Sequence, residues 1–248
     1  VVIFLIRIFK NKDTFHSVLQ RMGMNLPKRL KGELIWIHAA SVGESMVSIT
    51  LVQAISKIYP DKKFLITTGT LSSADILKKW LPKNAVHQFV PMDNLVLVRR
   101  FLKYWQPSIG IFIESELWPC LIMEAAKKFN LLLVNARLSD KSYKIWQKHT
   151  KIFQNITKNF KNILVQSKSD FSKYKNLGCK NVVNLGNLKF ANKELDVDKS
   201  ELKNLQKLFA SHQVFVASST HKEDEEIILE IVKDLKNKNL SYYPIVIL

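Results

Sequence analysis

Carboxylates, hydroxyls and cations follow directly after several short apolar runs of this 248-residue chain. The clearest case is Glu114-Ser115-Glu116, which comes straight after the apolar run 109–113. Two carboxylates would be costly to bury there without partners, so a polar site explains them better than a packed interior. Such a carboxylate could act as a general base, and nearby cations could neutralise a phosphate-type leaving group.

Other polar segments end apolar runs in the same way, at residues 38–44, 67–70, 135–139, 186–189 and 218–221. Arg137 and Lys189 are candidate counter-charges for the carboxylates or for a bound anion. Structural interpretations compete with these. Ser41-Val42-Gly43-Glu44 has the spacing of a helix capping box, His38 is typical of a hydrogen-bonded structural histidine, and Gly69 is typical of a turn.

Several chemistries are excluded by missing motifs. The chain has no G-x-G-x-x-G after its first apolar run and no G-x-x-x-x-G-K-[ST], which argues against a dinucleotide oxidoreductase or a P-loop NTPase. No G-x-S-x-G segment is present, and no His/Cys cluster has zinc spacing. Cys120 and Cys179 cannot form a disulfide framework, which favours a reducing compartment.

The elements that must position these residues alternate along the chain. Short, consecutively apolar runs predict parallel strands that are covered on both faces, at 34–38, 63–68, 86–90, 109–113, 131–135, 162–166, 181–185, 213–217 and 244–248. Amphipathic segments predict helices between them, at 44–58, 71–81, 93–104, 117–129, 140–159, 168–177, 200–209 and 221–238. In 140–159 the residues Trp146, Phe153, Ile156 and Phe160 predict one apolar stripe. This alternation predicts a doubly wound α/β sheet whose carboxyl edge gathers the polar segments.

Composition shifts divide the chain. Residues 1–12 are apolar-rich and basic, and we interpret them as the remnant of an N-terminal membrane anchor. Residues 13–190 are predicted to form one α/β domain, the aperiodic polar segment 191–199 a linker, and 200–248 the start of a second domain, truncated at 248. The net charge of +17 implies an anionic partner, whether nucleic acid, a membrane surface or a phosphorylated substrate.

Five of these segments follow one another in an order that is found in a known enzyme family. They are His38-Ala39-Ala40-Ser41-Val42-Gly43-Glu44, Glu114-Ser115-Glu116-Leu117-Trp118-Pro119, Asn135-Ala136-Arg137-Leu138-Ser139, Gly186-Asn187-Leu188-Lys189-Phe190 and Ser219-Thr220-His221. Together they resemble the 3-deoxy-D-manno-octulosonic acid (Kdo) transferases of Gram-negative lipopolysaccharide synthesis. The resemblance implies a GT-B fold of two Rossmann-like domains, of which residues 13–190 would be the acceptor side and 200–248 the first part of the donor side.

The resemblance also implies an activity and roles for three residues. The family is an inverting, metal-independent glycosyltransferase that moves Kdo from CMP-Kdo, a substrate rather than a cofactor, to the lipid A precursor lipid IVA. Glu44 matches its proton acceptor, and Glu114 and Lys189 match its transition-state stabilisers. A helix N-terminus is expected to favour the ionised form of Glu44. The implied location is the cytoplasmic face of the inner membrane, as a monotopic protein with an N-terminal anchor.

Departures from the family pattern qualify this expectation. Lys141 stands where the family usually has arginine and Glu223 where it has glycine, and no Pro-Arg-His nucleotide motif is present. The chain by itself is therefore expected to be inactive. The implied partners are the lipid A precursor, CMP-Kdo and the anionic membrane surface, with no nucleic acid. The alternatives are a GT-B enzyme with another sugar donor, or a non-catalytic basic domain that binds nucleic acid or anionic membrane.

Overall fold

The computed structural model describes residues 7–8, 12–188, 198–210, 213–218, 220–237 and 242–247. The chain divides into two compact units, Val1–Asn192 and Lys193–Leu248. This division falls inside the segment 191–199. The assignment of the two units to acceptor and donor sides stays a prediction.

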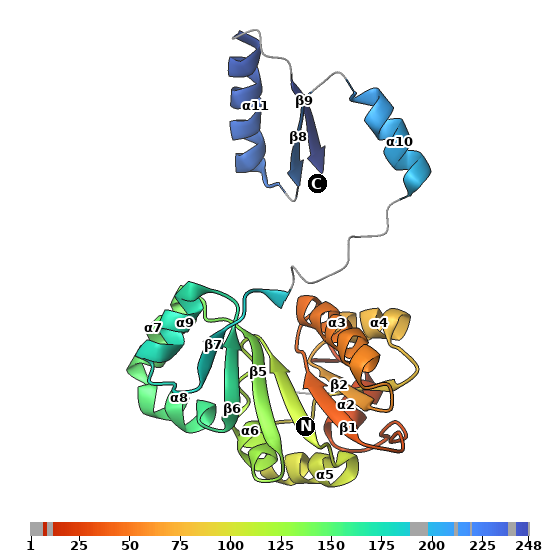
Figure 1. Cartoon of the computed structure of the whole chain (residues 1–248), viewed down its shortest axis with the longest axis vertical. Helices are drawn as coiled ribbons and strands as arrows, with labels where there is room; N and C mark the ends of the chain where they lie inside the picture. Colours follow the sequence, from red (N-terminus) through yellow and green to blue (C-terminus); the bar gives the residue numbers. More distant parts are fainter. Residues whose placement is uncertain are drawn as a thin grey trace. The chain divides into compact units, whose positions relative to one another are not determined.

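The first unit is built on a seven-stranded, wholly parallel sheet in the order β3-β2-β1-β4-β5-β6-β7 (Figure 1). Its strands are β1 Leu34–His38, β2 Lys63–Thr68, β3 Ala85–Phe89, β4 Ile109–Ile113, β5 Asn130–Ala136, β6 Phe160–Val165 and β7 Val182–Asn184. Each lies within about two residues of the predicted run. The order reverses between β1 and β4, so the carboxyl ends of these two strands flank the topological switch point.

Helices cover both faces of this sheet. They are α2 Phe15–Arg21, α3 Val42–Ile58, α4 Leu71–Trp80, α5 Leu95–Trp105, α6 Pro119–Ala126, α7 Asp140–Lys148, α8 Thr150–Thr157 and α9 Lys168–Asn176. Alternate side chains of β1 point to opposite faces. Ile35 and Ile37 join the apolar cluster formed with α3 and α4, and Leu34 and Trp36 join the cluster formed with α5, α6, α8 and α9.

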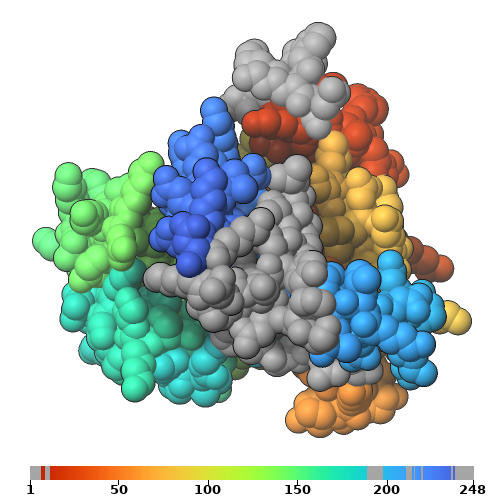
Figure 2. Space-filling view, turned by 90° about the horizontal axis from the view of Figure 1, so that it is seen from above, coloured from red at the N-terminus to blue at the C-terminus, as the bar shows by residue number. Residues whose placement is uncertain are grey.

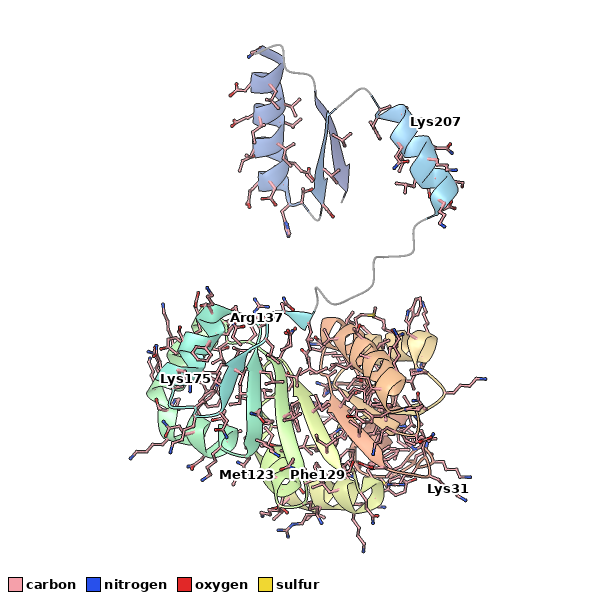
Figure 3. The ribbon with its side chains drawn as sticks, in the orientation of Figure 1. Lys31, Met123, Phe129, Arg137, Lys175 and Lys207 are labelled. Atoms are coloured by element: carbon pink, nitrogen blue, oxygen red, sulfur yellow. The ribbon has the colours of Figure 1, made fainter. Side chains whose placement is uncertain are left out.

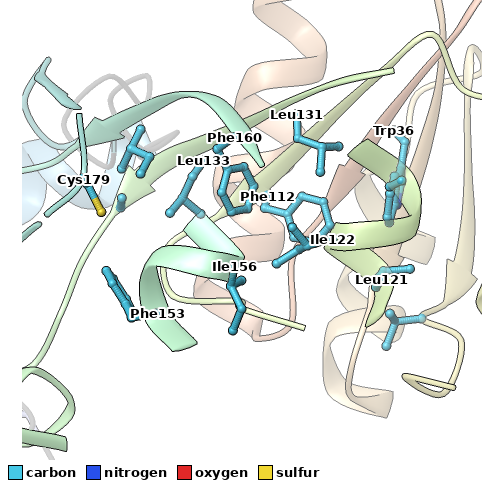
Figure 4. Close-up of a cluster of buried hydrophobic side chains, with 14 of the residues drawn as sticks. Trp36, Phe112, Leu121, Ile122, Leu131, Leu133, Phe153, Ile156, Phe160 and Cys179 are labelled. Carbon is cyan, nitrogen blue, oxygen red and sulfur yellow. The ribbon is translucent and has the colours of Figure 1, made fainter. Parts of the chain in front are cut away.

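Aromatic rings pack against one another within the larger cluster (Figure 4). Phe112 on β4 lies at its centre, with ring centroids 5.1 Å from Trp36 and 5.6 Å from Phe160. Both contacts are edge-to-face, the geometry that the ring quadrupoles favour. Phe112 is fully buried. The same ring contacts His38 at 5.3 Å, so the core reaches directly to the polar end of β1.

The second unit contains α10 Lys199–Leu208, β8 Gln213–Ser218, α11 Lys222–Asn237 and β9 Tyr242–Ile247. Strands β8 and β9 pair in parallel. Parallel neighbours require a crossover, and α11 supplies it. The predicted strand–helix–strand order of 200–248 is confirmed.

One helix prediction needs correction, and one helix was not predicted. Residues 140–159 do not form one helix: α7 and α8 are separated at His149, whose φ of −126° and ψ of 35° are not helical. Phe160 begins β6 instead of continuing the stripe. The sequence pattern also missed α2, which Thr14 caps through a reciprocal pair of hydrogen bonds with Ser17.

The predicted anchor remnant, residues 1–12, lies mostly outside the described residues. Among the helices that the structure describes, none is long and apolar enough to cross a membrane.

The aromatic core yields a stability prediction. We expect Phe112→Ala to lower the free energy of unfolding by about 3–5 kcal/mol, because it removes a fully buried ring from a packed cluster. Urea unfolding followed by tryptophan fluorescence measures this, because all five tryptophans precede residue 150 and therefore belong to the first unit. The matched control is Phe15→Ala, a ring that is 72% exposed, with an expected change within about 0.5 kcal/mol. Equal effects of the two substitutions would contradict the prediction.

Candidate functional site at the carboxyl edge of the sheet

The loops after β1 and β4 meet at the switch point, because these strands are neighbours in the sheet. His38, the last residue of β1, is in register with Phe112, two residues before Glu114. Strands β1 to β7 run in one direction, so their carboxyl ends share one edge of the unit. Figure 3 shows this for β5, with Phe129 before its start and Arg137 after its end at the opposite edge. Glu44 and the segment containing Glu114 and Glu116 therefore come from adjacent strands.

Glu44 is held by the first turn of α3. The hydroxyl of Ser41 caps the helix by accepting from the Glu44 amide, at 3.4 Å. The same hydroxyl donates to Glu44 Oε1 at 2.8 Å, and the Ala40 amide donates to Oε2 at 2.7 Å. The predicted capping role is thus present in modified form, since the carboxylate binds the Ala40 amide instead of the amide of the N-cap residue. Only 7% of Glu44 is exposed.

Burial raises the pKa of the Glu44 carboxyl. Hydrogen bonds from Ser41 and Ala40 lower it, whereas the negative charges of Glu116 and Glu114 raise it further, and the net direction is upward. The expectation that the helix N-terminus would favour the ionised form is therefore wrong for the net balance, because desolvation outweighs the donors. A carboxylate with a raised pKa is a better proton acceptor near neutral pH.

Glu116 is fixed by a chain of side chains that runs into the core. The Trp118 indole donates to Glu116 Oε2 at 2.6 Å, and His38 Nε2 lies 3.6 Å from the same oxygen. On the other side of the ring, His38 Nδ1 lies 3.0 Å from Thr67 Oγ1, which also accepts from the Trp36 indole. The Thr67 hydroxyl therefore donates to His38 Nδ1. This assigns the proton of the neutral imidazole to Nε2, which faces Glu116.

These side chains favour the ionised form of the Glu116 carboxyl. Burial by itself would raise the pKa of Glu116, but His38 and Trp118 together hold it below its usual value. His38 is fully buried, and its Nε2 has no hydrogen-bond partner among the described residues. The structural interpretation of His38 is confirmed, and its purpose is now specific: the imidazole supports a carboxylate at the edge of the sheet.

Two residues at this edge adopt left-handed backbone conformations. Glu114 has φ of 59° and Asn135 has φ of 55°, at the ends of neighbouring strands β4 and β5. Asn135 sits where the β5–β6 register shifts, so it forms a bulge. Such strain in residues other than glycine is typical of functional sites. The buried Asn135 side chain accepts from the Leu188 amide at 3.0 Å, which ties the loop after β7 to the end of β5.

Of the two predicted cations, the structure describes Arg137 but not Lys189. Lys189 lies outside the described residues, immediately after Leu188. Arg137 is exposed, and its guanidinium forms no ion pair with any described residue. Its carbonyl instead accepts from the Ser115 hydroxyl. Arg137 therefore does not pair with the carboxylates within the described part of the chain, and its role towards a bound anion stays a prediction. The Trp118 indole is the hydrogen-bond donor to Glu116.

The motif at 219–221 belongs to the second unit, and Ser219 lies outside the described residues. Helix α11 begins after His221, whose amide donates to Asp224 Oδ2 at 2.9 Å. Asp224 therefore caps the first turn of α11, which starts one residue later than the predicted helix 221–238. Thr220 donates to Glu225 Oε1 at 3.0 Å.

The sequence pattern did not single out the side chains that surround Glu116. Only the spacing Glu116–Trp118 signalled one of them, because an indole two residues after a carboxylate can donate to it. Thr67 and His38 are 29 residues apart and meet only through the pairing of β1 with β2. Within the described ranges, no group of three or more His, Cys, Asp or Glu side chains is arranged to hold a metal ion.

The chain is similar in sequence to the members of one protein family. A family profile described as 3-deoxy-D-manno-octulosonic-acid transferase (kdotransferase) matches residues 16–192. The chain is 58% identical over 214 residues to the 3-deoxy-D-manno-octulosonic acid transferase of Rickettsia felis, covering 86% of this chain and 46% of the relative. It is 50% identical over 246 residues to the Rickettsia bellii transferase of the same name, covering 99% and 59%. The chain thus spans about half the length of these relatives.

Solved structures show the fold. The crystal structure of a putative UDP-N-acetylglucosamine 2-epimerase from Listeria monocytogenes superposes with a TM-score of 0.59 at 12% identity, covering 87% of this chain and 62% of that one. With the seven-stranded parallel sheet, this likeness confirms the predicted GT-B class of α/β fold.

The electrostatics of the site yield a prediction about Glu44. Replacing Glu116 by glutamine removes a negative charge that raises the Glu44 pKa, so we expect the Glu44 pKa to fall in Glu116→Gln. Carboxyl carbon chemical shifts of labelled glutamate, followed through a pH titration, measure it. The control is Glu33→Gln, which removes an exposed carboxylate at the start of β1, the opposite end from His38, and should leave the Glu44 titration in place. An unchanged or higher Glu44 pKa in Glu116→Gln would refute this account.

Proposed function

Because this chain belongs to the family of 3-deoxy-D-manno-octulosonic acid transferases, we propose that the protein containing it transfers Kdo from CMP-Kdo to a lipid A precursor. One observation supports this most strongly: a buried carboxylate with raised proton affinity, Glu44, lies at the topological switch point beside the segment that carries Glu114 and Glu116. An acceptor hydroxyl that reaches Glu44 meets a base poised to take its proton.

Glu44 accepts the proton of the acceptor hydroxyl, the oxygen forms a bond to the anomeric carbon of Kdo, and the bond from that carbon to the CMP phosphate oxygen breaks. Attack from the face opposite the leaving group inverts the configuration. CMP departs with the electron pair of the broken bond, and no metal takes part.

The two other family positions have complementary tasks in this proposal. Positive charge develops on the anomeric carbon when a glycosidic bond breaks. An anionic Glu114 would stabilise that charge. Lys189 would offset the negative charge that develops on the leaving phosphate. Its place in the chain, one residue after the Leu188 amide bound by Asn135, supports a role at the same edge of the sheet.

Removing the base tests the proposal. We expect Glu44→Ala, in the gene product that carries this chain, to lower Kdo transfer to lipid IVA by about 10²–10⁴-fold, because general base catalysis contributes that much. Transfer is measured with radiolabelled acceptor and CMP-Kdo. The control is Glu33→Ala, an exposed glutamate at the other end of β1, which should retain activity. An active Glu44→Ala enzyme would exclude this role for Glu44, and transfer of a different sugar by the unmodified protein would favour the GT-B alternative with another donor.

We also propose that the protein works at the cytoplasmic face of the inner membrane. Between residues 141 and 193 the chain has twelve lysines and one acid, Asp170. Helices α7 and α8 belong to the green to teal stretch of the chain in Figure 2. They expose Ile145 and Ile152, each about half accessible, among lysines. Apolar side chains surrounded by lysine suit an anionic lipid surface.

Vesicle binding tests the membrane proposal. Substituting Lys144, Lys148 and Lys151 with glutamate should weaken sedimentation with phosphatidylglycerol vesicles at least about tenfold, because each lysine near an anionic surface contributes about 1 kcal/mol. Substituting the exposed Lys78, Lys79 and Lys83 with glutamate changes net charge equally and should have a smaller effect. Equal losses would show that total charge, and not this surface, governs binding.

A further inference from the structure

Helix α6 begins without a capping side chain of its own. It starts at Pro119, and the side chain of its N-cap residue, Trp118, makes no capping hydrogen bond. The first amides of a helix have no acceptor within it, and a Ser, Thr, Asp or Asn side chain at the N-cap usually accepts from them. An indole has a donor and no acceptor, and this one donates to Glu116 Oε2 at 2.6 Å. The position that would cap α6 therefore holds the residue that supports Glu116.

The missing cap is supplied by Asp93, on the loop after β3. Its Oδ1 accepts from the Leu121 amide at 2.7 Å, and its Oδ2 accepts from the Cys120 amide at 3.1 Å. These residues are the second and third of α6, and their amides are the ones from which an N-cap side chain accepts. A carboxylate at this end also interacts favourably with the helix dipole. Asp93 thus does the work of an N-cap residue from a different loop.

Asp93 is itself held in place through both of its neighbours in the chain. The Met92 amide donates to the Arg21 carbonyl at 3.2 Å, which ties this loop to the end of α2. Asn94 caps α5 by accepting from amides of its first turn. Helices α5 and α6 pack against each other, and both contribute buried side chains to the larger apolar cluster. Two consecutive residues therefore cap two neighbouring helices, which fixes the start of α6 relative to α5.

The first turn of α6 in turn fixes Trp118. The Trp118 carbonyl accepts from the Ile122 amide at 2.9 Å, so this residue belongs to the hydrogen-bonded turn that Asp93 caps. The indole lies edge-to-face against the His38 ring, with centroids 6.2 Å apart, while its N–H donates to Glu116. Because a tryptophan side chain has only two torsions, its N–H stays on Glu116 only while the Trp118 backbone is held.

We propose that Asp93 is a positioning residue for Glu116: it caps α6 from the loop after β3, so that Trp118 can give up the capping role and keep its indole on the carboxylate. The inference rests on the proposed function only in placing Glu116 at the site of that reaction. Burial, His38 and Trp118 determine the direction of the Glu116 pKa shift, and the charge of Asp93 has no part in it. The influence of Asp93 on Glu116 therefore passes through the indole.

The test follows Trp118 and Glu116 in the 248-residue chain. It uses neither donor nor acceptor, so its result is separate from that of the Kdo assay. In Asp93→Ala we expect the Trp118 indole N–H to exchange with solvent about fivefold faster, since loss of a helix cap corresponds to about that change in an equilibrium constant. We expect the Glu116 pKa to rise, because the indole is one of the donors that lower it. Nitrogen-resolved exchange and carboxyl carbon shifts of labelled glutamate through a pH titration measure the two effects, and the signal lost in Glu116→Gln identifies Glu116.

Asn94→Ala is the matched control, because it removes the cap of the neighbouring helix α5 at the adjacent position in the chain. It should lower stability to a similar degree and leave the Trp118 exchange rate and the Glu116 titration in place. Asp93→Asn keeps one accepting oxygen, so its effects should have the same direction and be smaller; it gives the readout where Asp93→Ala does not fold. The proposal is overturned if both signals in the Asp93 variants match those of the unmodified chain, or if Asn94→Ala changes both equally.

Discussion

The pairing of β1 with β4 is the interaction on which the site depends. Parallel hydrogen bonding from Ile35 to His38 brings the loops after these two strands to the same point of the sheet edge. Chain separation between them is about 70 residues, and nothing local could place Glu44 beside Glu114 and Glu116. A slip of the β1–β4 register by one residue would turn His38 from one face of the sheet to the other. His38 is the polar residue of β1, and its hydrogen bond to Thr67 is made only in the observed register.

Buried polar contacts extend this geometry into electrostatics. Trp36 and Thr67 belong to the interior, yet they determine which nitrogen of His38 faces Glu116. Glu116 in turn acts on Glu44 through its charge. Two carboxylates are thus driven in opposite directions: donors favour ionisation of Glu116, and burial together with neighbouring charge disfavours ionisation of Glu44. Divergence of this kind between neighbouring carboxyl groups is how one site obtains both a fixed anion and a proton acceptor.

The loops after β1 and β2 are in direct contact, since the Gly69 amide donates to the Ala40 carbonyl at 3.3 Å. Gly69 lies so near the loop after β1 that a Cβ would be 3.2 Å from the Ala40 carbonyl oxygen, and the Gly69 carbonyl accepts from Arg21. The glycine expected to serve a turn is therefore required by a close approach between the loops after β1 and β2.

The amino-acid sequence by itself determined the parallel α/β fold and the set of candidate groups. Consecutively apolar runs bounded by polar residues locate parallel strands within a residue or two, because burial on both faces leaves no other pattern. Glu44 and Glu114 were found in this way, since polar residues just after buried strands mark the sheet edge. Periodicity missed the break at His149, where the backbone leaves the helical conformation, and the helix Phe15–Arg21, whose start is set by the local Thr14–Ser17 cap. Only the tertiary structure decided that His38 lies behind Glu116, that the Arg137 carbonyl accepts from Ser115, and that Arg21 joins Asp13 to the loops after β2 and β3. Each of these depends on strands paired across tens of residues, and charge at a site is set by the neighbours that such pairing brings together.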